Sequence, residues 1–145
     1  MIVGTRIEHR HPVFRDFPTS YYADWQWWDI LNYATAVDLT RYPRALTPVI
    51  QSVDTYEVNR KLGVSFEARV GSGKLFVLVV DPVKDIEKRP AMQQLLTSVR
   101  NYVASDRFAP TVTLQLYELD ALFDYNKIRE TETRSDEAVK QLLNQ

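Results

Sequence analysis

The sequence contains no cysteine among its 145 residues. This absence excludes disulfide bonds, thiolate metal sites and cysteine nucleophiles together. There are only two histidines, and no serine lies in a Gly-x-Ser-x-Gly context, so a serine–histidine–acid triad has no support. No run approaches the roughly 20 apolar residues that a membrane helix needs, so we predict no membrane partner.

The chain also lacks an excess of charge of either sign. Its 18 basic and 19 acidic residues give a formal net charge of −1, which excludes a global field that recruits nucleic acid or anionic lipid. Apolar residues make up 45% and charged residues 26%, as in soluble globular proteins. The chain begins at Met1 without an apolar signal region, so we expect a cytosolic protein, a mature form or an excised domain.

Glycine is scarce, and three of the four glycines fall around one predicted hairpin. Strict alternation over 62–70 predicts a strand with a single apolar face, made of Leu62, Val64, Phe66, Ala68 and Val70. Gly71-Ser72-Gly73 supplies a tight turn. The unbroken apolar run over 75–80 then predicts a partner strand that is covered on both faces.

The other predicted elements are shorter or bounded by proline. Pro90 and an apolar stripe predict a helix over 89–105. Asp24 is expected to cap a helix over 25–32 with Trp28 and Leu31 on one side; a strand is the alternative. Short strands are expected over 2–7, 34–39, 49–53 and 111–116, and a helical turn over 118–123.

These elements predict an α/β layered domain with a mixed β-sheet, a central antiparallel hairpin and covering helices. An α+β arrangement of the same layers is the alternative. We assign residues 1–124 to one domain. Residues 125–145 form a polar tail, in which 135–145 are expected either to make a short amphipathic helix or to be frayed.

Aromatic residues are concentrated early, and all three tryptophans lie within four positions. One hypothesis makes this segment a carbohydrate platform, with rings stacking on sugars and polar side chains binding hydroxyls. Its candidate residues are Tyr22, Asp24, Trp25, Gln26, Trp27, Trp28 and Asp29. The alternative, which we favour, is that these large rings belong to the core or to an interface.

A second candidate is the loop that follows the strand at 49–53. Asp54, Asn59 and Arg60 lie in it and could meet a ligand, because loops at strand ends often bind ligands in layered folds. The favoured alternative is that Arg60 pairs with a carboxylate and fixes the loop. His9 and His11 are spaced to chelate zinc or nickel, but no third ligand is indicated, so we predict no metal and no cofactor.

Paired carboxylates are required for glycoside hydrolysis. Asp24, Asp29, Asp54 and Glu67 are available, but a helix would place Asp24 and Asp29 on different faces. We therefore predict no catalysis by this chain alone.

A series of short motifs runs through residues 9–123. The main ones are His11-Pro12-Val13-Phe14, Phe17-Pro18-Thr19, Trp25-Gln26-Trp27-Trp28-Asp29, Asn59-Arg60-Lys61-Leu62-Gly63 and Val70-Gly71-Ser72-Gly73-Lys74-Leu75. Together they resemble a region near the C-terminus of bacterial family 2 glycoside hydrolases, the β-galactosidase-like enzymes.

This resemblance implies a non-catalytic accessory module. In such enzymes the catalytic residues lie in a separate barrel domain, which 145 residues cannot contain. It also implies a fold similar to class I glutamine amidotransferases, although their cysteine nucleophile is absent here. The implied partners are other domains of a parent hydrolase, further copies of the chain in a homo-oligomer, and carbohydrate. The implied location is periplasmic or extracellular.

Overall fold

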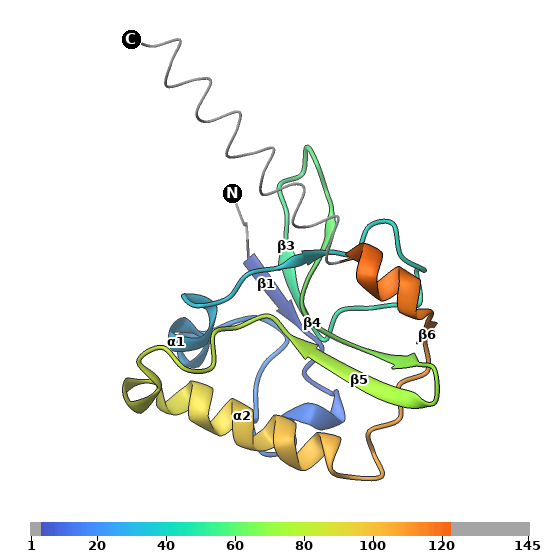
Figure 1. Ribbon diagram of the computed structural model, residues 1–145. Helices are drawn as coiled ribbons and strands as arrows, with labels where there is room; N and C mark the ends of the chain where they lie inside the picture. The colour runs from blue at the N-terminus through green and yellow to red at the C-terminus, as the bar shows by residue number, and fades with distance from the viewer. Residues whose placement is uncertain (1–3, 123–145) are drawn as a thin grey trace.

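Six strands form one mixed β-sheet in the computed structural model, which describes residues 4–122 of the chain. The strands are β1 (Gly4–Ile7), β2 (Val37–Asp38), β3 (Ile50–Val53), β4 (Lys61–Val70), β5 (Gly73–Leu78) and β6 (Thr113–Leu114). β4 is central: its first half pairs with β3 and β2, and its second half pairs with β5 and β6. The β4–β6 pair is parallel and the other pairs are antiparallel (Figure 1). The predicted α/β class, mixed sheet and central hairpin are confirmed.

The helical elements are short except for one. They are η1 (Pro12–Phe14), η2 (Trp25–Trp27), α1 (Trp28–Leu31), η3 (Ile86–Lys88) and α2 (Pro90–Val103), and residues 116–122 are also helical. α2 begins at Pro90, one residue later than predicted, and Pro90 lies in its first turn as expected, where the missing N–H costs nothing. Met92, Leu95 and Tyr102 on its apolar stripe are buried, which confirms the predicted core-facing side.

Each face of the sheet carries its own apolar core. The alternation along β5 shows this division: Phe76 and Leu78 pack in the first core, and Val77 packs in the second. α2 and the segment that holds η1, η2 and α1 cover the first core, whereas residues from 39–46 and 112–122 cover the second (Figure 1).

β4 departs from the predicted single apolar face. Val64 packs in the first core, whereas Phe66 and Ala68 pack in the second. The register with β3 shifts between Ile50 and Gln51, so the pairing is irregular at this point of β4. A β-bulge of this kind reorients the side chains that follow it, and Leu62 through Phe66 are all buried. The strand is therefore enclosed on both faces. β5, for which we predicted such enclosure, is only half-buried over residues 75–78.

Several predicted short elements are shorter in the structure. The strand expected over 34–39 is reduced to β2, and the strand expected over 111–116 to β6, because each pairs with β4 at only two positions. β1 and β3 confirm the other two predicted strands. The tail at 125–145 and its predicted helix lie outside the described residues. Within residues 4–122, no helix combines the length and the apolar character needed to cross a membrane.

Arg89 joins three segments that lie beside the first core. It is 2% exposed, and its guanidinium donates to the carbonyl oxygens of Asp29, Asp81 and Lys84 at 2.8, 2.8 and 2.9 Å. Its Cζ lies 4.1 Å from the ring centroid of Tyr33, a cation–π distance. One buried cation therefore fixes α1 and the loop after β5 against the start of α2.

We expect Arg89→Met to destabilise the protein by about 3 kcal/mol, because three carbonyl groups lose their donor while the volume is nearly kept. The matched control is Lys88→Met, since the side chain of Lys88 is 76% exposed. Urea unfolding of both variants checks this. Equal stabilities for the two variants would contradict the role assigned to Arg89.

Candidate functional site

The aromatic segment at 21–28 is built on a capped helical turn. Asp24 is the cap, as predicted: its Oδ1 accepts the backbone N–H of Gln26 at 3.1 Å. The turn is a 3₁₀ helix followed by one α-turn, in which residues three apart lie on the same side. Trp27 and Ile30 are both 0% exposed, so they form the inner side. Trp28 is exposed and Leu31 is half-buried, so the side that these two residues were expected to share is not the buried one.

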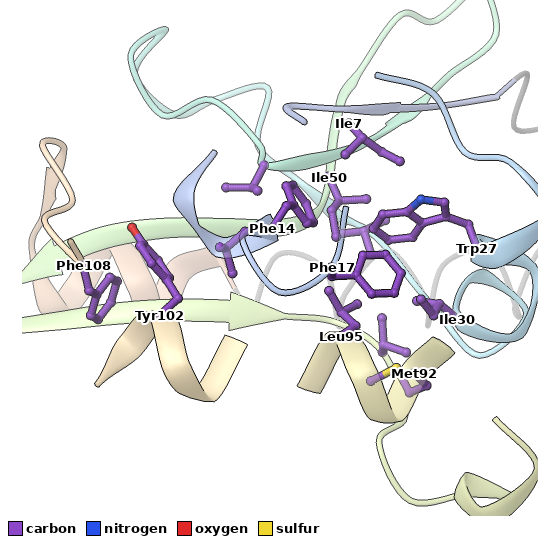
Figure 2. Packing of buried hydrophobic residues seen from close by; sticks show 14 residues of the cluster. Ile7, Phe14, Phe17, Trp27, Ile30, Ile50, Met92, Leu95, Tyr102 and Phe108 are labelled. Atoms are coloured by element: carbon purple, nitrogen blue, oxygen red, sulfur yellow. The ribbon is translucent and has the colours of Figure 1, made fainter. Parts of the chain in front are cut away.

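Trp27 anchors this segment in the first core (Figure 2). Its ring makes edge-to-face contacts with Phe14 and Phe17, with centroids 6.0 and 5.2 Å away. Its Nε1 donates to Thr19 Oγ1 at 2.8 Å, so the buried indole is also satisfied as a donor. Trp27 is therefore removed from the predicted carbohydrate-binding residues, because a ring with no exposed surface cannot stack on a sugar.

The other large rings of the segment face solvent. We call Tyr21, Tyr22, Trp25 and Trp28 the exposed aromatic group; they are 64%, 52%, 89% and 64% exposed. Tyr21 and Tyr22 contact each other edge to face at 5.0 Å. Four large rings within eight residues of the sequence are therefore accessible to solvent.

The polar side chains beside these rings hold the segment itself. Gln26 is half-buried, and its Nε2 donates to the carbonyl oxygen of Pro18 at 3.0 Å. Asp29 turns inward, where its Oδ2 accepts the backbone N–H of Ala91 at 3.2 Å near the start of α2. Asp24 is exposed next to Trp25 while it caps the turn. The exposed aromatic group therefore faces solvent, and the backbone that carries it is held in place by these hydrogen bonds.

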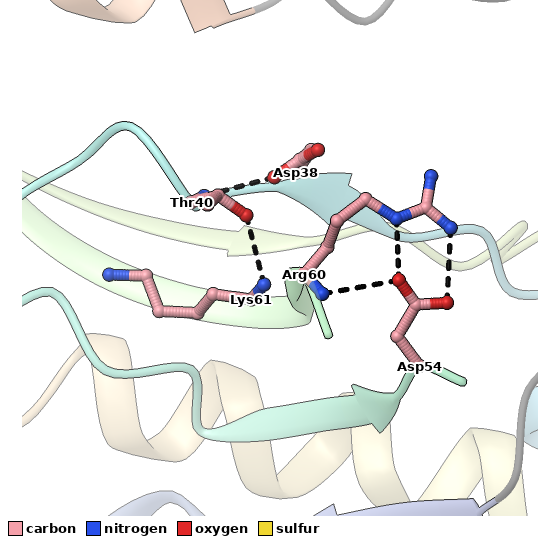
Figure 3. Close-up of polar contacts among 5 residues, drawn as sticks. All are labelled: Asp38, Thr40, Asp54, Arg60 and Lys61. Atoms are coloured by element: carbon pink, nitrogen blue, oxygen red, sulfur yellow. Dashed lines mark hydrogen bonds and ion pairs between the residues drawn. The ribbon is translucent and has the colours of Figure 1, made fainter. Parts of the chain in front are cut away.

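Asp54 and Arg60 lie at the base of the loop between β3 and β4, away from α1 (Figure 1). They form an ion pair, in which Arg60 Nη2 lies 3.1 Å from Asp54 Oδ1, and the backbone N–H of Arg60 also donates to Asp54 (Figure 3). The side-chain hydrogen bond from Arg60 holds the pKa of Asp54 well below its usual range. The expectation that Arg60 pairs with a carboxylate and fixes the loop is confirmed.

A cavity that the sequence did not predict opens near this end of the sheet. It has a volume of about 260 Å³ and is lined by Asp38, Arg41, Tyr42, Tyr117, Glu118 and Ala121. Its two walls come from segments 76 residues apart, which are joined by a 2.7 Å hydrogen bond from the Tyr42 hydroxyl to the Glu118 carbonyl. No local motif contains both walls, so only the fold brings them together.

His11 and Glu67 form a histidine–carboxylate contact, with His11 Nε2 3.5 Å from Glu67 Oε1. Both imidazole nitrogens are engaged, because Nδ1 accepts the backbone N–H of Val13. The hydroxyl of Tyr102 donates to the same carboxylate at 2.7 Å. His9 lies elsewhere, beside the ring of Tyr21. The arrangement of His11 therefore braces η1 against β4 and α2 and leaves no lone pair for a general base.

Trp27→Ala should destabilise the protein by about 3–5 kcal/mol, because it opens a large cavity in the first core. Trp25→Ala, at an 89% exposed position of the same turn, should change the free energy of unfolding by less than about 0.5 kcal/mol. Chemical denaturation of the two variants measures both effects. A large loss in Trp25→Ala would show that this ring packs against the domain.

Glu67 makes stability depend on pH. Burial raises the pKa of Glu67, but hydrogen bonds from His11 and Tyr102 outweigh burial, so the folded-state pKa lies below the ordinary 4.5. The carboxylate therefore stabilises the fold above pH 4.5, and this contribution is lost as the pH falls through the lowered value.

Glu67→Gln should accordingly flatten the loss of stability below about pH 4.5. Glu87→Gln, at an exposed position, serves as the control and should keep the wild-type profile. Thermal unfolding between acidic and neutral pH checks this. An unchanged acid profile in Glu67→Gln would contradict the assignment.

A family model described as a domain of unknown function (DUF8487) matches residues 1–124. No curated protein sequence matches the chain significantly. With most of its length covered by this model, the chain belongs to the DUF8487 family.

Proposed function

We propose that this chain is a non-catalytic accessory domain of a glycoside hydrolase of the β-galactosidase type. In this role it supports the catalytic domain or helps to assemble subunits, and the exposed aromatic group is its contact surface. The observation that carries the proposal is the division of the tryptophans, in which Trp27 is fully buried while Trp25 and Trp28 point to solvent. Such rings are typical of surfaces that are covered in a complex.

The polar groups support a non-catalytic role. Asp24, Asp29 and Asp54 were the carboxylates considered for hydrolysis, and each of them binds a backbone N–H or an arginine of the chain itself. Glu67 is bound by His11 and Tyr102. General acid–base chemistry needs such groups to face a substrate instead.

The finer fold proposal is a glutamine amidotransferase-like layer of the kind that β-galactosidase trimerisation domains use. A mixed sheet with helical residues on both faces and a parallel β4–β6 pair agrees with this proposal. The same resemblance proposes an exported parent protein, in the periplasm or outside the cell.

A second candidate function is carbohydrate binding by the exposed aromatic group. One observation favours it: Trp25 is 89% exposed beside the carboxylate of Asp24. An indole face with an adjacent acceptor suits a pyranose ring and its hydroxyls. This candidate and the structural role predict different responses to sugar, so one titration separates them.

The accessory role predicts the size and activity of the native protein. An antibody against this chain should isolate a polypeptide longer than 145 residues by at least a barrel domain of about 250 residues. That protein should hydrolyse p-nitrophenyl β-galactoside, whereas the 145-residue chain should not. A native polypeptide without glycosidase activity would overturn the proposal.

The carbohydrate candidate predicts quenching of tryptophan fluorescence by β-galactosides or plant oligosaccharides. The change should saturate, disappear in Trp25→Ala and persist in Tyr56→Ala, whose ring is 91% exposed on the β3–β4 loop. A flat titration across the panel would reject carbohydrate binding and leave the structural role.

A further inference from the structure

We infer that the outer edge of β5 pairs with the same edge of a second copy of this chain, in antiparallel orientation about a twofold axis. The two six-stranded sheets then join into one sheet across a dimer. This inference names a surface that is separate from the exposed aromatic group at 21–28, and it does not rest on the proposed accessory role.

The outer edge of β5 carries open backbone hydrogen-bonding groups. β5 borders the sheet and pairs with β4 alone (Figure 1). Just beyond the strand, Val79 N donates to Val64 O at 2.8 Å. Because these groups alternate in direction along a strand, the N–H and C=O groups of Lys74, Phe76 and Leu78 face away from β4. No other backbone segment within residues 4–122 hydrogen-bonds to them.

The outer strand β1, in contrast, is covered by the chain itself. Ile7 N donates to Tyr21 O at 2.8 Å, and Ala23 N donates to Thr5 O at 3.2 Å. Proteins commonly protect a sheet edge by such a cover, or by charges, proline or a bulge, because an open edge pairs readily with another chain. β5 has no proline, keeps a regular register with β4, and carries one charged residue, Lys74, near its start.

The side chains of β5 are also incompletely covered. Residues 75–79 form an unbroken apolar run, which is typical of a strand with cover on both faces, yet each of them is only half-buried. Phe76 and Leu78 pack in the first core, whereas Val77 and Val79 pack in the second. A strand added along the open edge covers both sets together, and this apolar burial stabilises the pairing.

A second copy of β5 is a complementary partner for this edge. In an antiparallel pairing centred on Phe76, each outward N–H meets a C=O of the second copy. Lys74 then lies opposite the apolar Leu78, and the two Lys74 residues are four positions, or roughly 13 Å, apart along the strands. Arg69, which pairs with Lys74, makes the start of the hairpin strand basic, and this end approaches Asp81 of the second copy. A parallel pairing would align the two basic ends instead.

The test combines molar mass with amide hydrogen exchange of the full chain. Because a twofold pairing uses both open edges, the mass by light scattering should rise with concentration from 16.9 kDa towards twice this value and stop there. Over the same range, exchange of the Phe76 and Leu78 amides, followed by NMR, should slow at least about tenfold. The Leu75 amide faces β4 and is the internal control, whose exchange should change less.

Two matched variants test the orientation of the pairing. Leu78→Lys places a positive charge opposite Lys74 of the second copy and should weaken the dimer at least about tenfold. Leu78→Glu changes the same half-buried position but places opposite charges together, so it should dimerise more tightly than Leu78→Lys. Val58→Lys, at a 59% exposed position of the β3–β4 loop, should dimerise as the wild type does. Circular dichroism checks that each variant is folded.

Three results would overturn the inference. They are a monomeric mass at every concentration, a dimer in which the Phe76 amide exchanges as fast as in the monomer, and a dimer that is lost in Trp25→Ala/Trp28→Ala but kept in Leu78→Lys. The last result would assign self-association to the exposed aromatic group. The β-galactosidase assay of the native protein is independent of these outcomes, so the two proposals fail separately.

Discussion

The burial of Trp27 is the constraint on which the presentation of the aromatic segment depends. Its indole lies between Phe14 and Phe17 in the first core, and its N–H is bound by Thr19. Because this ring is locked inside, the turn around it has one fixed orientation. Trp25 and Trp28 must then stand in solvent, where their apolar area is a cost that a partner or ligand would relieve.

Further hydrogen bonds join the segments that cover the first core to α2. The hydroxyl of Ser98 on α2 donates to the carbonyl oxygen of Val13 and accepts the backbone N–H of Asp16. These two hydrogen bonds hold the segment around η1 against α2. Arg89 binds the carbonyl of Asp29, and thereby joins α1 to the start of the same helix. The exposed aromatic group therefore sits on a scaffold that is buried and hydrogen-bonded on its inner side.

Long periodic patterns predicted the fold well. The hairpin at 61–78 and the helix α2 follow from alternation and from a helical stripe, because each pattern repeats several times. The phase of the short turn at 25–31 could not be predicted, since aromatic residues occupy both of its sides and only two turns exist. The bulge in β4 was also invisible, because it depends on the register with β3 and not on local composition.

The candidate sites also differ in whether local sequence could predict them. The Asp54–Arg60 pair could be predicted, because both residues lie in one charged loop. The cavity could not, because Tyr42 and Glu118 are brought together only by the packing of the second core. Asp29 illustrates the converse error: its position beside Trp28 suggested ligand binding, whereas its carboxylate accepts a backbone N–H of α2.

The central claim is that one tryptophan anchors the segment in the core while the other two are exposed to solvent. Acrylamide quenching of the wild type and of the double variant Trp25→Phe/Trp28→Phe tests it most directly. The account predicts strong quenching of the wild type, and in the double variant a blue-shifted emission that acrylamide hardly quenches. An indole in the double variant that is quenched as readily as free tryptophan would contradict it.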